Sequence, residues 1–432
     1  MLQRNKEDIM KKLQKVLCLV LACAMVLSLA ACGGKSSGEA DLKVGVILLG
    51  DEAEGYTKAH IDGIKAAAKT LGLKDSQIIW KYKIGEDARC KDAALDLVGQ
   101  GCNIIFSNSY GHQTHMVEAA ADYPEVTFVA MTGDFAAICG LNNLKNAFTC
   151  VYESRYVSGV VAGMKLKELM DNGTLTAENH PENFTANGNV KIGYVGAFNY
   201  SEVVSGYTAF YLGVKSIVSN VEMEVIYTNS WFDIDKEGAA AEALVANGAV
   251  IVGQHADSTG APAAVQKLSN AGTLCFSVGY NIDMLETAPT VALTSATNNW
   301  AAYYTYALQA ALNGEEIATD WAKGYSADAV AITPLGSACA AGTAEKVADV
   351  EAALKAGTLH VFDTASFTVG GKTVTSAPCD MSFMDWSINK VIYEGKTVEA
   401  IVDGYFSEST FRSAPYFALR IDGITENATP IQ

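Results

Sequence analysis

The chain is poor in cationic side chains and in histidine, and it has no closely spaced cysteines. Its 432 residues include 31 Lys and Arg against 48 Asp and Glu, for a formal net charge of −17. Nucleic acid and anionic membrane surfaces are therefore poor partners. The six histidines show no H-E-x-x-H spacing and no two cysteines are spaced C-x-x-C, so neither a metal site nor a redox motif is indicated.

Motifs of catalysis are missing as well. No G-x-S-x-G nucleophile elbow stands between a predicted strand and a helix, and the first glycine-bearing loop lacks the spacing of a phosphate-binding loop. His255, Asp257 and Ser258 lie close together in the sequence. However, residues two apart cannot form the usual hydrogen bond between a base and the carboxylate that orients it. We therefore expect a binding protein without a cofactor, and not an enzyme.

The apolar run near the N-terminus is shorter than the 20 or so residues that a membrane span needs. Three lysines precede the apolar residues 17–29, and the run ends in Leu27-Ser28-Leu29-Ala30-Ala31-Cys32. This pattern is typical of a lipoprotein signal peptide. We predict that residues 1–31 are removed, that Cys32 is lipidated, and that residues 32–41 form a tether. The mature chain would then be anchored to the cell membrane on its extracytoplasmic side.

The cysteines after Cys32 mostly lie in apolar segments. They are Cys90, Cys102, Cys139, Cys150, Cys275, Cys339 and Cys379. We expect small buried side chains at these positions, although a disulfide stays possible outside the cytoplasm.

Beyond the tether, buried strands alternate with helices in two series. The first series has predicted strands at 42–49, 78–82, 103–107 and 126–130, with helices at 57–71, 88–100 and 114–121. The second follows a helix at 155–170 and has strands at 190–195, 222–227, 250–253 and 274–278. Such alternation predicts two lobes, each with a parallel sheet covered on both faces. Ligands of such sheets bind beyond the carboxyl ends of the strands, so two facing lobes would enclose a ligand.

Three loops that follow predicted strands offer groups for binding a ring. The first places Tyr56 and Thr57 at the start of a helix, although Thr57 could equally cap that helix and Tyr56 cover it. Trp231 and Phe232 are adjacent, and one of them should point outward to stack on a planar heterocycle or a sugar face. The carboxylate of Asp257 could accept hydrogen bonds from ring N–H groups or ribose hydroxyls.

Several segments follow one another in an order that is typical of a known family. They are Gly55-Tyr56-Thr57-Lys58-Ala59-His60, Ile105-Phe106-Ser107-Asn108-Ser109-Tyr110-Gly111, Tyr123-Pro124-Glu125-Val126-Thr127-Phe128, 152–163, Asn229-Ser230-Trp231-Phe232-Asp233, Gln254-His255-Ala256-Asp257-Ser258 and 294–300. From about Lys43 to Phe362, the chain resembles the basic membrane protein family of substrate-binding lipoproteins. These lipoproteins serve ABC importers and include binders of purine bases and nucleosides.

The resemblance implies an α/β type I periplasmic-binding-protein fold, with two doubly wound parallel-sheet lobes joined by a three-segment hinge. The first lobe would comprise residues 42–151 and 282–314, and the second residues 152–281 and 315–363. Residues 364–432 would form a C-terminal extension packed on the second lobe. A hairpin turn is predicted within it at Gly370-Gly371.

The resemblance also implies a ligand site, because purine binders of the family hold the base between aromatic rings and its edge with Asn and carboxylate side chains. By position, the aromatic candidates are Tyr56, Phe198 and Trp231, and the polar candidates are Thr57, Ser109, Glu153, Asn199, Asp257 and Asn299.

We thus expect a monomer that captures a purine base or nucleoside and delivers it to the permease subunits of an ABC importer. Tyr56-Thr57 stands where the nucleoside-binding branch has Phe-Asn, and no lysine occupies a ribose-binding position, which favours a free base. The alternatives are a sugar or another heterocycle in the same fold, or a surface lipoprotein that signals without transport.

Overall fold

The computed structural model describes residues 42–385 and 388–427. The predicted signal peptide, tether and lipidated Cys32 lie outside the described residues. Among the residues described, no helix is long and apolar enough to cross a membrane.

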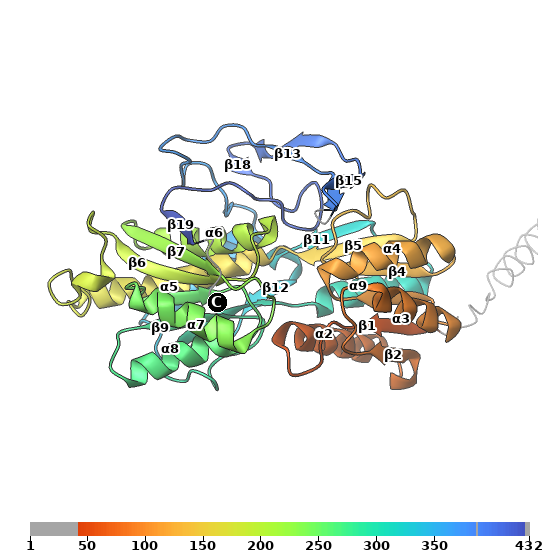
Figure 1. The fold of residues 1–432 in the computed structure, drawn as a ribbon, viewed down its shortest axis with the longest axis horizontal. Coiled ribbons are helices and arrows are strands. Elements are labelled where there is room, and N and C mark those ends of the chain that lie inside the picture. Colours follow the sequence, from red (N-terminus) through yellow and green to blue (C-terminus); the bar gives the residue numbers. More distant parts are fainter. Residues whose placement is uncertain (1–41, 386–387, 428–432) are drawn as a thin grey trace, which may run out of the picture. The chain divides into compact units, whose positions relative to one another are not determined.

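The first lobe contains a six-stranded parallel sheet (Figure 1). Its order is β11 (Asp320–Lys323), β5 (Leu144–Thr149), β4 (Thr127–Met131), β3 (Ile104–Ser107), β1 (Val44–Ile47) and β2 (Ile78–Lys81). The helices of this lobe are α2 (Gly55–Leu71), α3 (Ala88–Gly99), α4 (Gln113–Asp122) and α9 (Ala301–Asn313). Every residue of β1, β3 and β5 is buried, as expected for strands covered on both faces.

The second lobe contains a seven-stranded sheet. Its order is β12 (Val330–Ile332), β10 (Ala292–Asn298), β9 (Phe276–Tyr280), β8 (Ile251–Gln254), β6 (Val190–Gly196), β7 (Val221–Tyr227) and β19 (Ile424–Asn427). Only β12 is antiparallel to its neighbour among the strands described in this sheet. The helices are α5 (Val151–Asp171), α6 (Ser201–Lys215), α7 (Ile234–Ala246), α8 (Gly260–Asn270) and α10 (Thr343–Lys355). The predicted α/β class with two parallel-sheet lobes is therefore confirmed.

The chain passes between the lobes three times: from β5 to α5, from β10 to α9, and from β11 to the short 3-10 helix Tyr325–Ala327. Two segments do not follow the predicted lobe boundaries. Residues 282–314 were expected in the first lobe, but β10 pairs with β9 in the second sheet. Residues 315–363 were expected in the second lobe, but β11 pairs with β5 in the first. Strand pairing decides the sheet to which a strand belongs, and apolar pattern alone does not reveal it.

The C-terminal extension, described here over residues 364–385 and 388–427, consists of short strands. They are β13 (Pro378–Asp380), β14 (Phe383–Asp385), β15 (Lys390–Tyr393), β16 (Thr397–Glu399), β17 (Ile401–Val402), β18 (Tyr405–Phe406) and β19. The predicted Gly-Gly turn is present, with Gly370 and Gly371 at φ 58° and 75° between the bridged residues Val369 and Lys372. The extension contacts the second lobe, where β19 pairs with β7.

The extension also contacts the first lobe, which was not predicted. Phe383 of β14 belongs to the apolar core of the first lobe, and its ring lies 4.6 Å from that of Phe135. Figure 1 shows β13 to β18 on one side of both sheets. The extension is therefore bound to both lobes.

Candidate functional site

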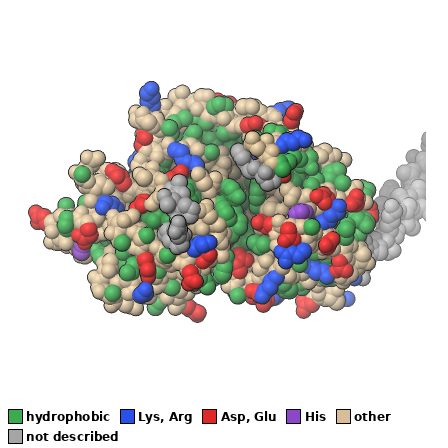
Figure 2. All heavy atoms as spheres, in the orientation of Figure 1, with side chains coloured by type: hydrophobic (Ala, Val, Ile, Leu, Met, Phe, Trp, Pro, Cys, Tyr) green, Lys and Arg blue, Asp and Glu red, His purple; other side chains and the backbone are tan. Residues whose placement is uncertain are grey.

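A cavity of about 570 Å³ lies where the carboxyl ends of both sheets meet. The first lobe lines it with Leu49, Glu54, Tyr56, Ser109, Tyr110, Thr132, Asp134 and Phe148. The second lobe contributes Asn199, Tyr200, Ser201, Glu202, Trp231, His255, Asp257 and Tyr280. The extension adds Asp380, Ser382, Phe383, Met384, Arg412, Ala414 and Pro415. In Figure 2, hydrophobic side chains gather between the lobes, whereas charged side chains are scattered over the outer surface.

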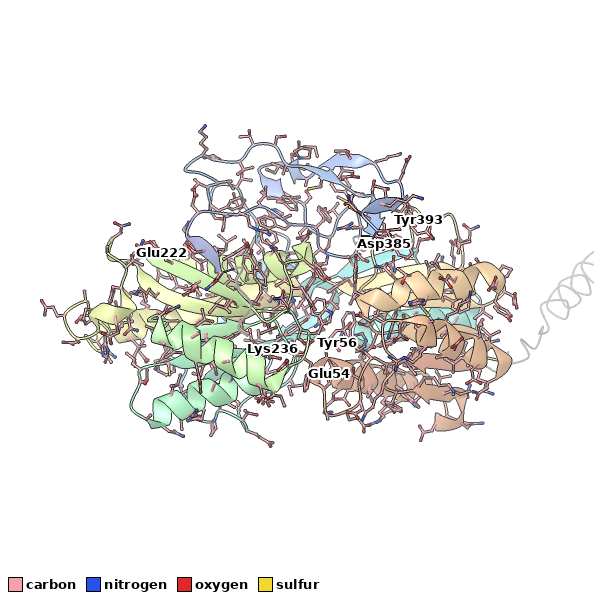
Figure 3. The ribbon with its side chains drawn as sticks, in the orientation of Figure 1. Glu54, Tyr56, Glu222, Lys236, Asp385 and Tyr393 are labelled. Carbon is pink, nitrogen blue, oxygen red and sulfur yellow. The ribbon has the colours of Figure 1, made fainter. Side chains whose placement is uncertain are left out.

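Tyr56 forms part of the first-lobe wall from the first turn of α2. Its hydroxyl donates to the carbonyl of Asn108 (2.6 Å), and its ring packs edge-on against His60 at 4.6 Å. Figure 3 shows Glu54 and Tyr56 at the end of α2 that faces the second lobe. The ring position is therefore fixed by a hydrogen bond and by packing, so a ligand that stacked on the ring would cost it little conformational entropy.

Aromatic side chains of the second lobe stand together at the ends of β6 and β7. The ring of Trp231 packs edge-on against that of Phe198, with 4.9 Å between the ring centres, and its centre lies 6.0 Å from that of Tyr200. The ring of Tyr200 stacks on that of Phe198, and its centre lies 6.3 Å from the ring centre of Tyr110 in the first lobe. The rings of Trp231 and Tyr200 line the cavity, while Phe198 supports them from behind.

Asp257 is a buried carboxylate, 6% exposed, at the second-lobe side of the cavity. Asn281 donates to its Oδ1 (2.6 Å). Burial raises the pKa of Asp257 well above its usual range, and the carboxylates of Glu54 and Glu237 raise it further. Burial also raises the pKa of Glu54, which lines the cavity from the first lobe. Ligand groups that donate hydrogen bonds would relieve the repulsion between these acids.

Glu202 and His255 form a second polar pair in the second-lobe wall. His255 Nε2 lies 2.7 Å from Glu202 Oε2. Burial and the neighbouring Arg155 charge lower the pKa of His255, while the Glu202 carboxylate acts in the opposite direction. Burial acts to raise the pKa of Glu202, but His255 and Arg155 lower it overall. The Arg155 guanidinium is itself buried, 3.9 Å above the ring of Tyr280.

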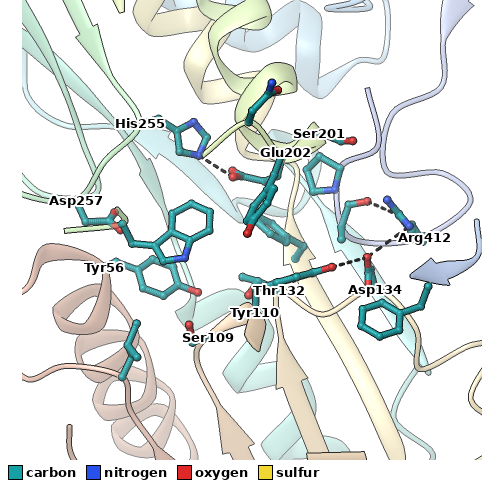
Figure 4. Close-up of a pocket in the computed structure, with 18 of the residues that line it drawn as sticks. Tyr56, Ser109, Tyr110, Thr132, Asp134, Ser201, Glu202, His255, Asp257 and Arg412 are labelled. Atoms are coloured by element: carbon teal, nitrogen blue, oxygen red, sulfur yellow. Dashed lines mark hydrogen bonds and ion pairs between the residues drawn. The ribbon is translucent and has the colours of Figure 1, made fainter. Parts of the chain in front are cut away.

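Asp134 and Arg412 meet at another part of the cavity wall (Figure 4). Arg412 Nη1 lies 3.5 Å from Asp134 Oδ2, and the hydroxyl of Tyr110 donates to the same oxygen (3.1 Å). Gln113 donates to Asp134 Oδ1 (3.1 Å). Burial raises the pKa of Asp134, and the charge of Arg412 acts in the opposite direction. Both side chains are largely shielded from solvent, since 14% of Arg412 and 9% of Asp134 is exposed.

Five of the predicted site residues line the cavity, namely Tyr56, Ser109, Asn199, Trp231 and Asp257. Ser109 donates to Glu86 (2.6 Å), and Asn199 accepts from Arg420 of the extension (2.6 Å). The structure thus brings these residues, from loops far apart in the sequence, to one cavity.

Four other predicted residues do not line the cavity. Thr57 instead holds its own loop, through hydrogen bonds to Glu54 and to Asn108 (3.1 Å). Glu153 accepts from the backbone N–H of Tyr325 (2.7 Å), which fixes the third crossover between the lobes. Phe198 lies behind Trp231 and Tyr200, as described above.

Asn299, the fourth of these residues, donates to the carbonyl of Asp328 (2.7 Å) at a loop. For all four, the side chain contacts another residue of the protein, and the sequence pattern does not show that contact.

Sequence reasoning missed most of the remaining wall. Glu202 follows a predicted strand and gave no signal beyond its position, and the extension carried no binding motif. Thr132 lines the cavity with φ at 63°, a left-handed conformation that strains a β-branched residue. No sequence pattern marks such a backbone. The adjacent aromatic residues of the 229–233 loop were the clearest available signal.

Comparisons with known proteins agree with this fold. A family model described as "ABC transporter substrate-binding protein PnrA-like" matches residues 43–355. A purine-binding protein of Brucella abortus is 32% identical over 283 residues, which cover 65% of this chain and 72% of that protein. A putative glucose-binding protein of an ABC transporter from Haloferax volcanii is 29% identical over 276 residues, covering 63% of this chain and 61% of that protein.

Solved structures share the fold at low sequence identity. A solute-binding protein of an ABC transporter system from Aeropyrum pernix superposes with a TM-score of 0.59 at 13% identity, covering 77% of this chain and 94% of that one. The chain therefore belongs to the Bmp family of PnrA-like substrate-binding proteins, which are not enzymes but bind small molecules outside the cytoplasm and deliver them to the permeases of ABC transporters.

Proposed function

We propose that this protein binds a purine base or purine nucleoside in the cavity between its lobes and delivers it to an ABC importer. The observation that carries the proposal is the presence of aromatic rings from both lobes, Tyr56 and Trp231, beside the buried carboxyl group of Asp257 and the half-buried one of Glu54. The similarity to a purine-binding protein supports it.

The aromatic rings account for the flat part of such a ligand. A purine stacks on indole and phenol faces, and each stacked base contributes about 1–3 kcal/mol. In the proposed complex, Trp231 and Tyr56 supply these faces from opposite lobes. Stacking is tolerant of ring substituents, so the aromatic residues select a planar ring and leave the choice among purines to the polar groups.

The carboxylates account for the edge of the ring. A carboxylate accepts hydrogen bonds from ring N–H and amino groups. Such donors favour the ionised form of Asp257 and Glu54, against the effect of burial on their pKa values. Asp257, Glu54 and Glu202 would accept from such groups, and Ser109 and Asn199 would complete the contacts. A ligand that donates hydrogen bonds to acids of both lobes binds more tightly when the lobes are close together. It therefore favours a closed arrangement of the lobes over an open one.

Isothermal titration tests the proposal directly. Adenine, guanine, hypoxanthine and their nucleosides are titrated into the purified protein, with glucose as the comparison ligand. We expect micromolar or tighter binding of at least one purine. Absence of binding to all of them would contradict the proposal.

A sugar is the second candidate ligand. Aromatic faces and carboxylates also recognise the apolar face and the hydroxyls of a sugar, and the Haloferax volcanii relative is named as a putative glucose-binding protein. Binding of glucose without binding of purines in the same titration would favour this alternative.

We also propose that Cys32 carries a lipid anchor, as the sequence that precedes it predicts. Cells that express the full chain should incorporate a labelled fatty acid into it, and Cys32→Ser should abolish the label. Equal labelling of the variant would contradict the anchor.

A further inference from the structure

The C-terminal extension lies outside the part of the chain that the family model matches, residues 43–355. It nevertheless supplies seven of the residues that line the cavity, Asp380, Ser382, Phe383, Met384, Arg412, Ala414 and Pro415. The ligand site of this protein therefore has a wall that the matched region does not encode.

This wall is attached to the second lobe through apolar packing and a strand. Phe417 stacks on Phe362 at 4.3 Å, and both side chains are buried in the core of that lobe. The strand β19 extends the second sheet next to β7. The extension is thus a folded part of the lobe.

The same wall is fixed to the first lobe close to the cavity. The rings of Phe383 and Tyr393 lie 4.6 and 4.9 Å from Phe135. The backbone N–H of Ser413 donates to Asp320 Oδ1 (2.8 Å). Contacts to both lobes hold the cavity-lining residues of the extension in place, as a preorganised binding wall requires.

The polar groups at this wall differ from those near Trp231. Asp380 and Ser382 hydrogen-bond to one another (2.7 Å), while Arg412 pairs with Asp134. A guanidinium has five N–H donors, of which the contacts to Asp134 and to the carbonyl of Ala414 (3.4 Å) use a part. The wall formed by the extension therefore presents both hydrogen-bond donors and acceptors, whereas the part of the cavity near Asp257 presents mainly acceptors.

A hydroxyl group suits such a wall because it donates and accepts hydrogen bonds at once. Figure 4 shows Asp257 and Tyr56 on the opposite side of the cavity from Asp134 and Arg412. A ligand that reaches both sides would have a ring at the first and a hydroxylated group at the second.

We propose that the extension forms a second subsite for a hydroxylated substituent of the ring, with Arg412 as a specificity-determining residue. The inference rests on the proposed function, and it assigns the ligand to the class of glycosylated rings, nucleosides in preference to free bases. This assignment differs from the sequence-based expectation, which favoured a free base because of Tyr56-Thr57 in the first loop and the lack of a lysine at a ribose-binding position.

The test compares a matched pair of ligands, adenosine and adenine, by isothermal titration of the wild type and of Arg412→Met. Wild type should bind adenosine more tightly than adenine. In Arg412→Met, the affinity for adenosine should fall about tenfold or more, since a charge-assisted hydrogen bond is lost. The affinity for adenine should fall clearly less.

Arg89→Met is the matched control, because Arg89 also pairs with an aspartate but lies exposed, outside the cavity. It should leave both affinities unchanged. Equal losses for adenosine and adenine in Arg412→Met, or no loss for either, would overturn the subsite. If wild type binds neither adenosine nor adenine, the pairs guanosine and guanine, and inosine and hypoxanthine, take their place. The proposed function fails only if none of these six ligands binds to wild type, so its failure is distinguishable from that of the subsite.

A second variant keeps the test decisive if Arg412→Met does not fold, as judged by its thermal melt. Met384→Trp adds bulk to the half-buried wall of the extension. It should weaken adenosine binding more than adenine binding, because the substituent and the indole compete for the same volume. Equal effects on the two ligands would again overturn the subsite.

Discussion

Single side chains decide which chemical groups the cavity wall presents. Trp231 and Phe232 are neighbours in the sequence, but only Trp231 lines the cavity, while Phe232 is 40% exposed. The pair therefore offers a comparison of two aromatic residues in one loop, of which one faces the cavity.

Trp231→Ala should weaken purine binding by about 1–3 kcal/mol, the contribution of one stacked base. Titration calorimetry measures the change. Phe232→Ala is the control and should bind as wild type does. If Trp231→Ala binds with unchanged affinity, the indole only packs against its neighbours.

Glu237 is a buried acid that positions the site loop. Its carboxylate accepts from the backbone N–H groups of Asp233 (3.1 Å) and Ser258 (3.1 Å), and so joins α7 to the loop that carries Asp257. Burial raises its pKa from 4.5 to about 7, although these hydrogen bonds act in the opposite direction. A proton is therefore released when the protein unfolds between these two pH values, and stability falls as the pH rises through that interval.

Glu237→Gln removes this titration but keeps an oxygen that accepts hydrogen bonds. The free energy of unfolding of the variant should fall less steeply between pH 4.5 and 7 than that of wild type. Urea denaturation at several pH values measures the slope. Glu242→Gln, on the same helix but exposed, should keep the wild-type slope. An unchanged slope in Glu237→Gln would contradict the prediction.

Among the helices of the second lobe, α5 and α6 cross closely, and this packing depends on glycines at the crossing. A Cβ atom added to Gly159 of α5 would overlap the carbonyl oxygen of Phe210 in α6, and one added to Gly213 of α6 would overlap that of Tyr156. The two helix backbones are therefore in direct contact. This packing places α6, whose first turn carries Glu202, at the cavity.

Gly159→Ala should lower the free energy of unfolding by about 1–3 kcal/mol, because the helices must move apart to accept the methyl group. Chemical denaturation measures the loss. Gly99→Ala in α3 is the control, since nothing lies within 4 Å of its added Cβ. It should gain up to about 1 kcal/mol from helix propensity. A loss in Gly159→Ala no larger than in the control would contradict the close crossing.

The molecule as a whole couples its two lobes by three crossovers and by the extension. A ligand that contacts both lobes and binds only the folded state adds RT ln(1 + [L]/Kd) to stability, about 2.7 kcal/mol at 100 times Kd. The extension shares in this coupling, because it is anchored in the cores of both lobes.

A purine that binds as proposed should therefore raise the melting temperature in proportion to the logarithm of its concentration once the concentration exceeds Kd. Differential scanning calorimetry measures the shift, and Trp231→Ala should show a smaller one at equal ligand concentration. A melting temperature that does not move at saturating purine would contradict binding to the folded protein.

The sequence by itself determined the α/β class, the two lobes and several loops that meet at the cavity. Strands such as β1 and β3 are continuous apolar runs, and the ends of parallel strands must share one edge of a sheet. Trp231 and Asp257 could be placed at one edge of the second sheet for this reason.

Only the tertiary structure decided which sheet receives β10 and β11, and that Glu153 and Asn299 serve the hinge and a loop. These outcomes depend on pairing between distant strands and on backbone partners, which leave no local pattern. The contribution of the extension is of the same kind. Two apolar side chains of the extension anchor it: Phe383 packs in the core of the first lobe and Phe417 in the core of the second. The extension therefore runs across the cavity, and this brings Arg412 to Asp134.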